Sequence, residues 1–224
     1  QQQGDKKTPL GVYYITSFLE DKQLPELYGW GAFPINYPNA WDKGKNRTGS
    51  GIWLHGVPRD TYSRPPLDSN GCLVISNDFL FKIAPYLKIN TPIILSPEIH
   101  WLAKNQYKKH NNSFKNLVEQ WKSAWETKNL KQYLSFYSKS FSSVNKKYNS
   151  WAKHKRHIFS KTRKIKIEIE KLNIFSYPGE ENMLAVSFYQ NYKGDSYQSK
   201  GYKLQYWKKE NDGKWRIIYE NSKS

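Results

Sequence analysis

The segment RKIKIEIE at residues 163–170 alternates strictly between charged residues and isoleucine. A period of two residues is that of a β-strand, whose successive side chains point to opposite faces. One face of this predicted strand therefore carries Ile165, Ile167 and Ile169. Three more strands are predicted after it, at residues 183–192, 202–210 and 214–220. This run of strands predicts an antiparallel sheet in the last third of the chain.

A different period precedes this sheet. Between residues 113 and 141, apolar residues recur three or four positions apart, with a break near Lys128 and Asn129. The residues at this spacing are Leu117, Trp121, Trp125, Leu130, Tyr133, Leu134 and Tyr137. Helices followed by an antiparallel sheet predict an α+β domain over residues 113–224.

Residues 1–103 show a different sequence pattern, because Gly and Pro separate short extended runs. A short helix is predicted at residues 77–87, with Asn77 or Asp78 as its N-cap. Strands are predicted at residues 11–19, 51–57, 71–76 and 91–96. The first part of the chain is therefore predicted to be a mostly β domain.

The net charge of the chain changes at the boundary between these two regions. Residues 1–103 hold 10 Lys and Arg against 9 Asp and Glu, a net charge of +1, whereas residues 104–224 hold 26 against 10, a net charge of +16. The polar stretch at residues 104–112 is predicted to be a linker between two domains. No apolar run approaches the ~20 residues that span a membrane, and no signal peptide is predicted within these residues.

The basic second domain is expected to bind an anionic partner. Its lysines are scattered rather than clustered, and it has no RNP, KH or helix-turn-helix pattern, so nucleic acid is not the predicted partner. An anionic polymer is the predicted partner instead. A lysine-rich composition without any docking role is the alternative.

Cys72 is the only cysteine in the chain, which excludes an intramolecular disulfide and a thiolate-rich metal site. Attack on an amide carbonyl needs a thiolate, a base and donors for the oxyanion. His55 supplies a base, and Gly71 would let the backbone amides of Gly71 and Cys72 approach an oxyanion. An activated Cys72 is expected to react well below the free-thiol pKa of ~8.5. The alternative is an inert core cysteine beside the apolar run LVI.

Three landmarks in order resemble the signature of the YkuD-type L,D-transpeptidases. They are GDKKTPLGVYYI at residues 4–15, the HG pair at His55 and Gly56, and SNGC at residues 69–72. The resemblance covers about residues 4–96 and implies a β-rich fold in which a cysteine attacks a carbonyl of peptidoglycan stem peptides. By that match Cys72 is the nucleophile, His55 is the base, and the Gly56 carbonyl orients the imidazole. No metal or cofactor is implied.

This chain departs from the family pattern beside the cysteine. Many members carry His before the Gly-Cys pair and Arg two residues after the cysteine, where Asn70 and Val74 stand here. Arg59 and Arg64 are expected to replace the missing Arg as contacts to a substrate carboxylate. Further substrate-binding residues are predicted to be Trp53, Ser69 and Asn70. The first strands of the family's domain precede the GDK segment, so they are expected to be missing from this chain or supplied from elsewhere.

The second domain resembles the NTF2-like fold over residues 113–221, with the pattern W-x-x-A-W from Trp121 to Trp125 in its first helix. A YkuD-type domain followed by an NTF2-like one resembles the L,D-carboxypeptidases that set cell shape in helical epsilonproteobacteria. The resemblance implies a periplasmic hydrolase that trims tetrapeptide stems to tripeptides and releases D-alanine. It also implies that the anionic polymer expected to bind the second domain belongs to the cell envelope. The alternatives are an L,D-transpeptidase that forms 3–3 cross-links and a non-catalytic cell-wall-binding protein.

Two other groups of residues are candidates for function. The run HKRH at residues 154–157 spaces two histidines three positions apart, as a metal site would. Lys155 and Arg156 between them would repel a cation, so a solvated basic face is predicted instead. NTF2-like folds often enclose a cavity, whose candidate lining residues are Trp151, Tyr189 and Tyr202. Packing in the core is the prediction for these aromatic residues.

Overall fold

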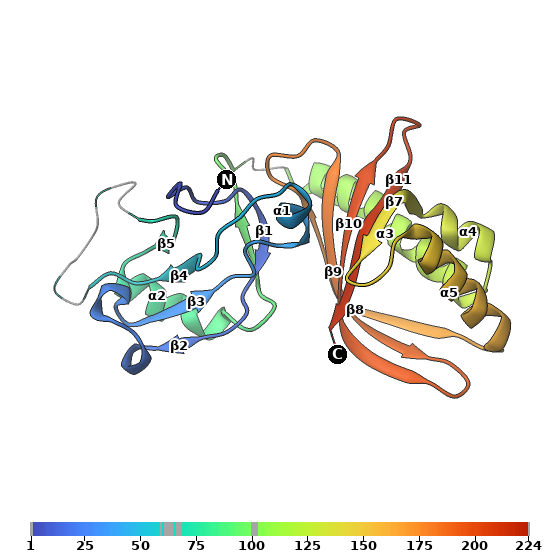
Figure 1. The fold of residues 1–224 in the computed structure, drawn as a ribbon, viewed down its shortest axis with the longest axis horizontal. Helices are drawn as coiled ribbons and strands as arrows, with labels where there is room; N and C mark the ends of the chain where they lie inside the picture. Colours follow the sequence, from blue (N-terminus) through green and yellow to red (C-terminus); the bar gives the residue numbers. More distant parts are fainter. Residues whose placement is uncertain (1, 59, 61–64, 66–68, 100–102, 224) are drawn as a thin grey trace. The chain divides into compact units, whose positions relative to one another are not determined.

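The computed structural model describes residues 2–58, 60, 65, 69–99 and 103–223. The chain divides into two compact units, one ending at Glu98 and the other beginning at Ile99 (Figure 1). None of the helices formed by the described residues is long and apolar enough to cross a membrane.

The first unit is built mainly from short strands, as predicted. Its described part contains a sheet of order β2-β3-β4-β5 and a separate antiparallel pair, β1 with β6. The strands are β1 (Gly11–Tyr14), β2 (Leu19–Glu20), β3 (Gly31–Pro34), β4 (Trp53–His55), β5 (Leu73–Val74) and β6 (Pro92–Leu95). The helices are α1 (Ala40–Gly44) and α2 (Asn77–Ile83), with 3-10 turns η1 (Asp21–Gln23), η2 (Glu26–Tyr28) and η3 (Ala84–Tyr86).

Two details of the first unit differ from the prediction. Helix α2 is capped by Ser76, whose hydroxyl accepts from the Phe79 amide at 3.3 Å, and not by Asn77 or Asp78. The Asn77 side chain is engaged in contacts outside the helix, described below. The sequence analysis also does not predict β3 or α1. Strand β3 is only four residues long and ends in Pro34, so it carries too little alternation to be recognised.

The core of the first unit consists of two neighbouring clusters beside β3 and β4. One cluster of buried residues joins β1, β6 and the segments beside β3 and β4, and its members are Tyr13, Ile35, Ile52 and Leu95. A second cluster packs α2 against the sheet, and its members are Ile15, Phe33, Leu54 and Leu80. Strand β4 is thus fixed by packing up to the residue before His55.

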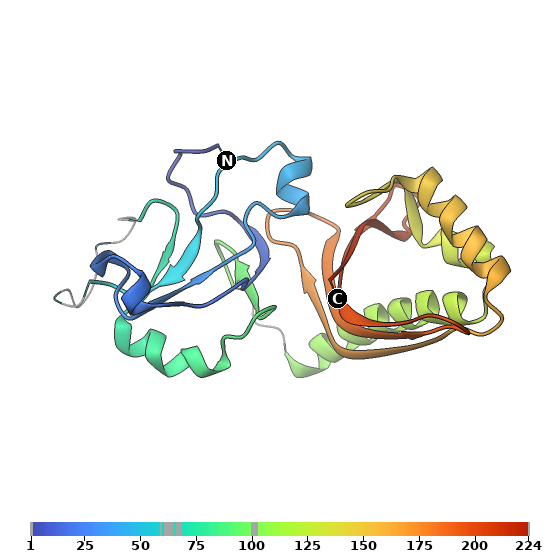
Figure 2. The same ribbon diagram turned by 60° about the horizontal axis from the view of Figure 1, so that its bottom comes forward.

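The second unit packs helices on one side of a curved sheet (Figure 2). The sheet has the order β7-β11-β10-β9-β8 in the described part of the chain. Its strands are β7 (Tyr137–Ser143), β8 (Lys166–Ser176), β9 (Met183–Lys193), β10 (Gln198–Lys209) and β11 (Trp215–Lys223). The helices are α3 (Lys104–Glu126), α4 (Leu130–Ser135) and α5 (Tyr148–Lys161). The α+β fold is confirmed, although β7 pairs with β11 in parallel.

Residues 104–112 are not an irregular linker, because they form the first turns of α3. Their polar composition suggests a loop, but Val118 and Trp121 anchor the following turns in the core. Once a helix is nucleated, each further residue adds a hydrogen bond at little cost, so the helix extends toward its N-terminus. Tyr137, predicted at a helical position, instead begins β7 after α4 ends at Ser135.

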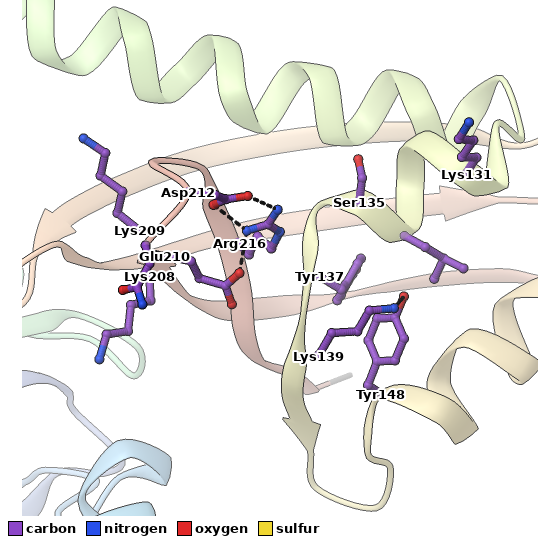
Figure 3. A pocket seen from close by; sticks show the side chains of 12 residues that line it. Lys131, Ser135, Tyr137, Lys139, Tyr148, Lys208, Lys209, Glu210, Asp212 and Arg216 are labelled. Carbon is purple, nitrogen blue, oxygen red and sulfur yellow. Dashed lines mark hydrogen bonds and ion pairs between the residues drawn. The ribbon is translucent and has the colours of Figure 1, made fainter.

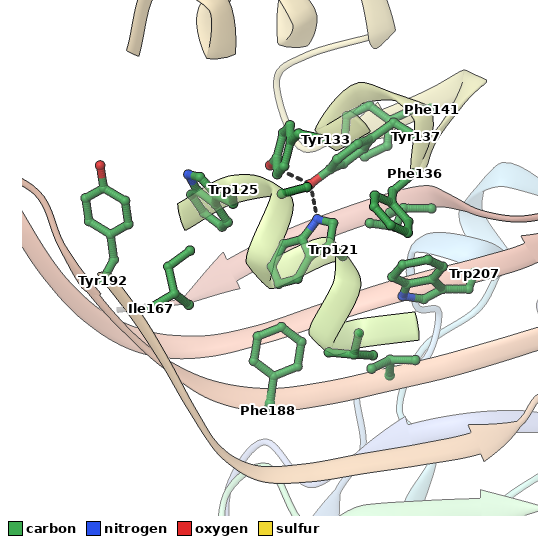
Figure 4. Close-up of a cluster of buried hydrophobic side chains, with 14 of the residues drawn as sticks. Trp121, Trp125, Tyr133, Phe136, Tyr137, Phe141, Ile167, Phe188, Tyr192 and Trp207 are labelled. Carbon is green, nitrogen blue, oxygen red and sulfur yellow. Dashed lines mark hydrogen bonds between the residues drawn. The ribbon is translucent and has the colours of Figure 1, made fainter. Parts of the chain in front are cut away.

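A hydrogen-bonded aromatic group lies at the centre of the second unit (Figure 4). The Trp121 indole Nε1 donates to the Tyr137 hydroxyl at 3.0 Å, and the hydroxyls of Tyr133 and Tyr137 are 2.7 Å apart. Tyr137 also donates to the Glu220 carboxylate at 3.0 Å. Ile165 and Ile167 are buried in the same core and Ile169 packs against it, as their shared face predicts.

Charged side chains are buried beside this aromatic group. Lys203 forms a 2.8 Å ion pair with Glu220, and Gln205 donates to the same carboxylate at 2.8 Å. Lys155 is only 4% exposed, and its ammonium lies 3.8 Å from the ring centroid of Trp125 and 4.5 Å from that of Trp151. The prediction that the HKRH run forms a solvated basic face is therefore wrong for Lys155. The residue points inward because α5 packs this face on the core.

Candidate active site

The parallel pairing of β4 with β5 brings the two halves of the candidate site together. Leu54 lies opposite Leu73, and His55 lies opposite Val74. Cys72 directly precedes β5, so it lies beside the start of β4, where the Trp53 backbone forms a hydrogen bond with its thiol. Residues two apart on a strand share a face, which places His55 on the Trp53 side of β4. This pairing closes the sequence gap between base and nucleophile.

His55 is buried and held by its own neighbour. Its Nδ1 lies 2.7 Å from the carbonyl oxygen of Gly56, and the Tyr28 ring meets the imidazole edge-on at 4.9 Å between centroids. A carbonyl can only accept, so Nδ1 carries the hydrogen in the neutral ring and Nε2 is the basic atom. This is the contact that an orienting role of Gly56 requires.

Asn77 holds the turn that contains Gly56. Its Nδ2 donates to the Val57 carbonyl at 2.8 Å, and its Oδ1 accepts from the Trp30 amide at 3.2 Å. The Gly56 amide donates to the Tyr28 carbonyl at 3.1 Å. A Cβ atom on Gly56 would overlap the Asn77 side-chain oxygen. The sequence analysis assigns Asn77 only to the start of a helix and misses this function. The single signal in the sequence is a polar residue three positions after the short strand that follows the cysteine.

Cys72 is half-buried. Its Sγ donates to the Gly51 carbonyl at 3.4 Å. Burial raises the pKa of the thiol, and the hydrogen bond from the Trp53 backbone only partly opposes this. The expectation of a thiol that reacts well below its ordinary pKa is therefore not met by the protein without substrate. A base must remove the proton when the thiol reacts.

The turn before Cys72 depends on Gly71 and Ser69. Gly71 has a φ of +94°, a conformation that favours glycine, and a Cβ atom there would lie 3.0 Å from the Ile52 side chain and 3.1 Å from the Lys7 carbonyl. The Ser69 hydroxyl donates to the Cys72 carbonyl at 2.8 Å, so it ties this turn together. Asn70 is exposed beside it.

The remaining predicted substrate contacts are only partly described. Trp53 is half-buried on β4, with its ring centroid 5.0 Å from that of Tyr28. Val74, where many family members carry Arg, is half-buried opposite His55. Arg59 and Arg64 lie outside the described residues.

The other candidate sites separate into core and surface. His154 and His157 are exposed, and no group of three or more potential metal ligands occurs among the described residues. Trp151 packs against the core of the second unit, and Tyr202 is buried. Tyr189 is 39% exposed and lines a small groove of about 220 Å³ with Lys171 and Lys200.

Fold and site together define a YkuD-type catalytic domain followed by an NTF2-like domain. The model of the L,D-transpeptidase catalytic domain family (YkuD) matches residues 1–95. The model of the Cds6 C-terminal NTF2-like domain matches residues 113–221. The resemblance inferred from the sequence motifs is thus confirmed.

Two solved structures match almost the whole chain. Bd1075 from Bdellovibrio bacteriovorus is 35% identical with a TM-score of 0.84, and the match covers 99% of this chain and 81% of that one. The helical cell shape determining protein Pgp2 from Campylobacter jejuni is 33% identical with a TM-score of 0.76, over 99% of this chain and 77% of that one. The chain belongs to this family of two-domain proteins, whose role is related to peptidoglycan. No curated protein sequence matches it significantly.

Proposed function

We propose that this protein is a peptidoglycan L,D-carboxypeptidase of the cell envelope that uses Cys72 as its nucleophile. The observation that supports this most is the β4–β5 pair, which brings the Cys72 thiol beside a strand that ends in His55. The imidazole is held through Nδ1 by a backbone carbonyl, which leaves Nε2 as the base. One relative in this family is a helical cell shape determining protein, and we extend that role to this chain.

The reaction begins with transfer of the Cys72 proton to His55 Nε2. The Sγ atom attacks the carbonyl carbon of the L-to-D bond before the terminal D-alanine of a tetrapeptide stem. The backbone amides of Gly71 and Cys72 receive the oxyanion. Protonated His55 gives its proton to the leaving amine, so D-alanine departs and a thioester remains. Water, deprotonated by His55, attacks the thioester, and the products are a tripeptide carboxylate and the restored thiol.

The raised pKa of Cys72 fits a proton transfer that accompanies attack. A thiol that stays protonated at neutral pH is a poor nucleophile until a base removes its proton. His55 therefore acts as a general base during the reaction and does not form a lasting ion pair with the cysteine. The same raised pKa is what a non-catalytic wall-binding protein would show, so that function is the second candidate.

The choice between water and an amine decides between carboxypeptidase and transpeptidase. Both reactions share the thioester, and they differ only in what attacks it. The test is incubation of the protein with defined tetrapeptide muropeptides, followed by mass analysis of the products. A carboxypeptidase yields tripeptide and free D-alanine with no dimers, even at high acceptor concentration. Dimers with 3–3 cross-links would assign a transpeptidase, and no turnover would favour the wall-binding protein.

A further inference from the structure

Tyr28 contacts the strand of the candidate base at three points. Its ring meets the His55 imidazole with 4.9 Å between the centroids and 73° between the planes. The same ring lies 5.0 Å from the ring of Trp53, at an angle of 42°. The backbone carbonyl of Tyr28 accepts a hydrogen bond from the Gly56 amide at 3.1 Å. The proposed reaction assigns no part to this residue.

The backbone of Tyr28 is fixed against the turn that follows His55. Tyr28 is the last residue of η2, and the next residue, Gly29, has a φ of +64°, a conformation that favours glycine. The Gly29 amide donates to the Glu26 carbonyl at 2.9 Å, which closes η2. A Cβ atom on Gly29 would overlap the carbonyl oxygen of Val57, so the two segments lie in direct contact. The Tyr28 ring is therefore presented to His55 from a rigid support.

The plane of the His55 imidazole needs such a support. The contact of Nδ1 with the Gly56 carbonyl, at 2.7 Å, fixes one atom of the ring. A carbonyl oxygen accepts hydrogen bonds over a broad range of directions, and the χ2 torsion of histidine has no sharp minimum. The ring can therefore tilt while this contact is kept, and a tilt would displace Nε2. An edge-to-face contact with a second, fixed ring restricts the tilt.

We propose that Tyr28 is a positioning residue, whose ring holds the plane of the His55 imidazole so that Nε2 stays directed for proton transfer from Cys72. The catalytic consequence rests on the proposed function, whereas the positioning is a property of the protein without substrate. The Tyr28 hydroxyl takes no part in the three contacts. Trp53 extends the arrangement to the nucleophile, because its ring packs on Tyr28 and its backbone forms a hydrogen bond with the Cys72 thiol.

The test compares Tyr28→Leu and Tyr28→Phe in the whole protein. Leucine removes the ring and keeps the backbone carbonyl that binds Gly56, whereas phenylalanine keeps the ring and removes only the hydroxyl. Nitrogen NMR of the neutral His55 imidazole measures how much of it carries its hydrogen on Nδ1. Release of D-alanine from a tetrapeptide muropeptide gives kcat and KM.

We expect Tyr28→Leu to convert part of the Nδ1–H form of His55 into the Nε2–H form. Its kcat should fall about tenfold or more while KM stays within about twofold, since only the alignment of the base is lost. Tyr28→Phe should restore the wild-type tautomer and a kcat within about twofold of the wild type. Melting temperatures check that each variant is folded, and Tyr28→Met replaces a leucine variant that does not fold.

Tyr148→Leu, in the second unit, is the matched control. Tyr148 is half-buried like Tyr28, and its ring also packs against a nitrogen-bearing side chain, because the Lys139 ammonium lies 4.2 Å from the ring centre. Tyr148 and Lys139 line a groove of about 850 Å³, and none of the described residues that line it takes part in the proposed reaction (Figure 3). The control should leave the His55 tautomer unchanged and kcat within about twofold of the wild type.

A wild-type tautomer in folded Tyr28→Leu would overturn the proposal, whether kcat is kept or lost, because the ring would then not hold the imidazole. An equal loss in Tyr28→Phe would also overturn it, since the hydroxyl and not the ring would be the active group. If the wild type releases no D-alanine, the proposed function fails, while the NMR comparison still decides whether Tyr28 positions His55.

Discussion

The side-chain amide of Asn77 donates a 2.8 Å hydrogen bond to the carbonyl of Val57, two residues beyond His55. Its oxygen accepts from the Trp30 amide. Between these contacts lies Gly56, whose carbonyl holds the imidazole. Asn77 therefore positions His55 through the backbone, although the two side chains belong to different elements.

Replacement of Asn77 should impair turnover through His55. Asn77→Ala removes the donor to Val57 and the acceptor for Trp30, so the imidazole loses its fixed orientation. We expect kcat to fall about tenfold or more, with a smaller change in KM. The pH profile of kcat/KM should also shift, which a purely structural defect would not cause. Asp78→Ala, at the exposed neighbouring position, is the control. Wild-type kinetics in Asn77→Ala would remove Asn77 from the account.

A methyl group on Gly56 should disrupt the same turn. In Gly56→Ala the added Cβ would overlap the Asn77 side-chain oxygen. Overpacking of this kind costs about 1–3 kcal/mol, and thermal unfolding of the purified protein measures it. Gly44→Ala is the matched control, because a Cβ there meets nothing within 4 Å. Equal melting temperatures for the two variants would mean that the turn is not tightly packed.

The reactivity of Cys72 toward iodoacetamide should depend on pH in a stated direction. Burial raises the pKa of this thiol, so the thiolate fraction at neutral pH is lower than for an exposed cysteine. The labelling rate of the substrate-free protein should rise with pH and reach its midpoint above that of a peptide thiol. A midpoint below that of the peptide would indicate a preformed thiolate and contradict the general-base mechanism.

The buried charge of Lys155 should make stability depend on pH. Desolvation lowers the pKa of this lysine to about 7 in the folded protein, against 10.5 for the free side chain. The folded state disfavours the protonated form of Lys155, so the buried charge destabilises the fold. This destabilisation is complete below pH 7. It is relieved as pH rises from about 7 to 10.5, where only the unfolded chain still binds the proton.

Lys155→Met should remove this penalty and should raise the melting temperature by a few degrees at pH 6 but much less at pH 9. Melting temperatures of variant and wild type across this pH range provide the measurement. Lys153→Met, at an exposed position on the same helix, is the control and should show no such difference. A difference for Lys155→Met that is the same at both pH values would contradict a buried charge.

Local patterns predicted the sheet of the second unit well. Ile165, Ile167 and Ile169 pack on its core because their alternation is a property of the strand alone. Lys155 could not be placed in the same way. Its aromatic surroundings come from three different helices, with Trp125 on α3, Tyr133 on α4 and Trp151 on α5. Trp151 is a local neighbour, four residues before Lys155 on α5, but only the tertiary fold adds Trp125 and Tyr133, and a single sequence carries no signal for that.

The candidate active site could also be predicted only in part from the sequence. His55 and Cys72 were proposed from the order of three motifs, and the pairing that relates them, β4 with β5, is a long-range contact. The positioning by Asn77 was missed because its side chain leaves its own helix to bind Val57 and Trp30. Ser69, expected to contact substrate, uses its hydroxyl to hold the turn at Cys72.

The measurement that tests the central claim most directly is release of D-alanine from a tetrapeptide muropeptide by the wild type and by Cys72→Ala. Loss of one sulfur leaves a small cavity, so the variant should fold normally, which its melting temperature checks. We predict release with stoichiometric tripeptide by the wild type and a loss of about a thousandfold or more in Cys72→Ala, with a similar loss in His55→Ala because the two act as a unit. Release by a folded Cys72→Ala variant at the wild-type rate would contradict the account.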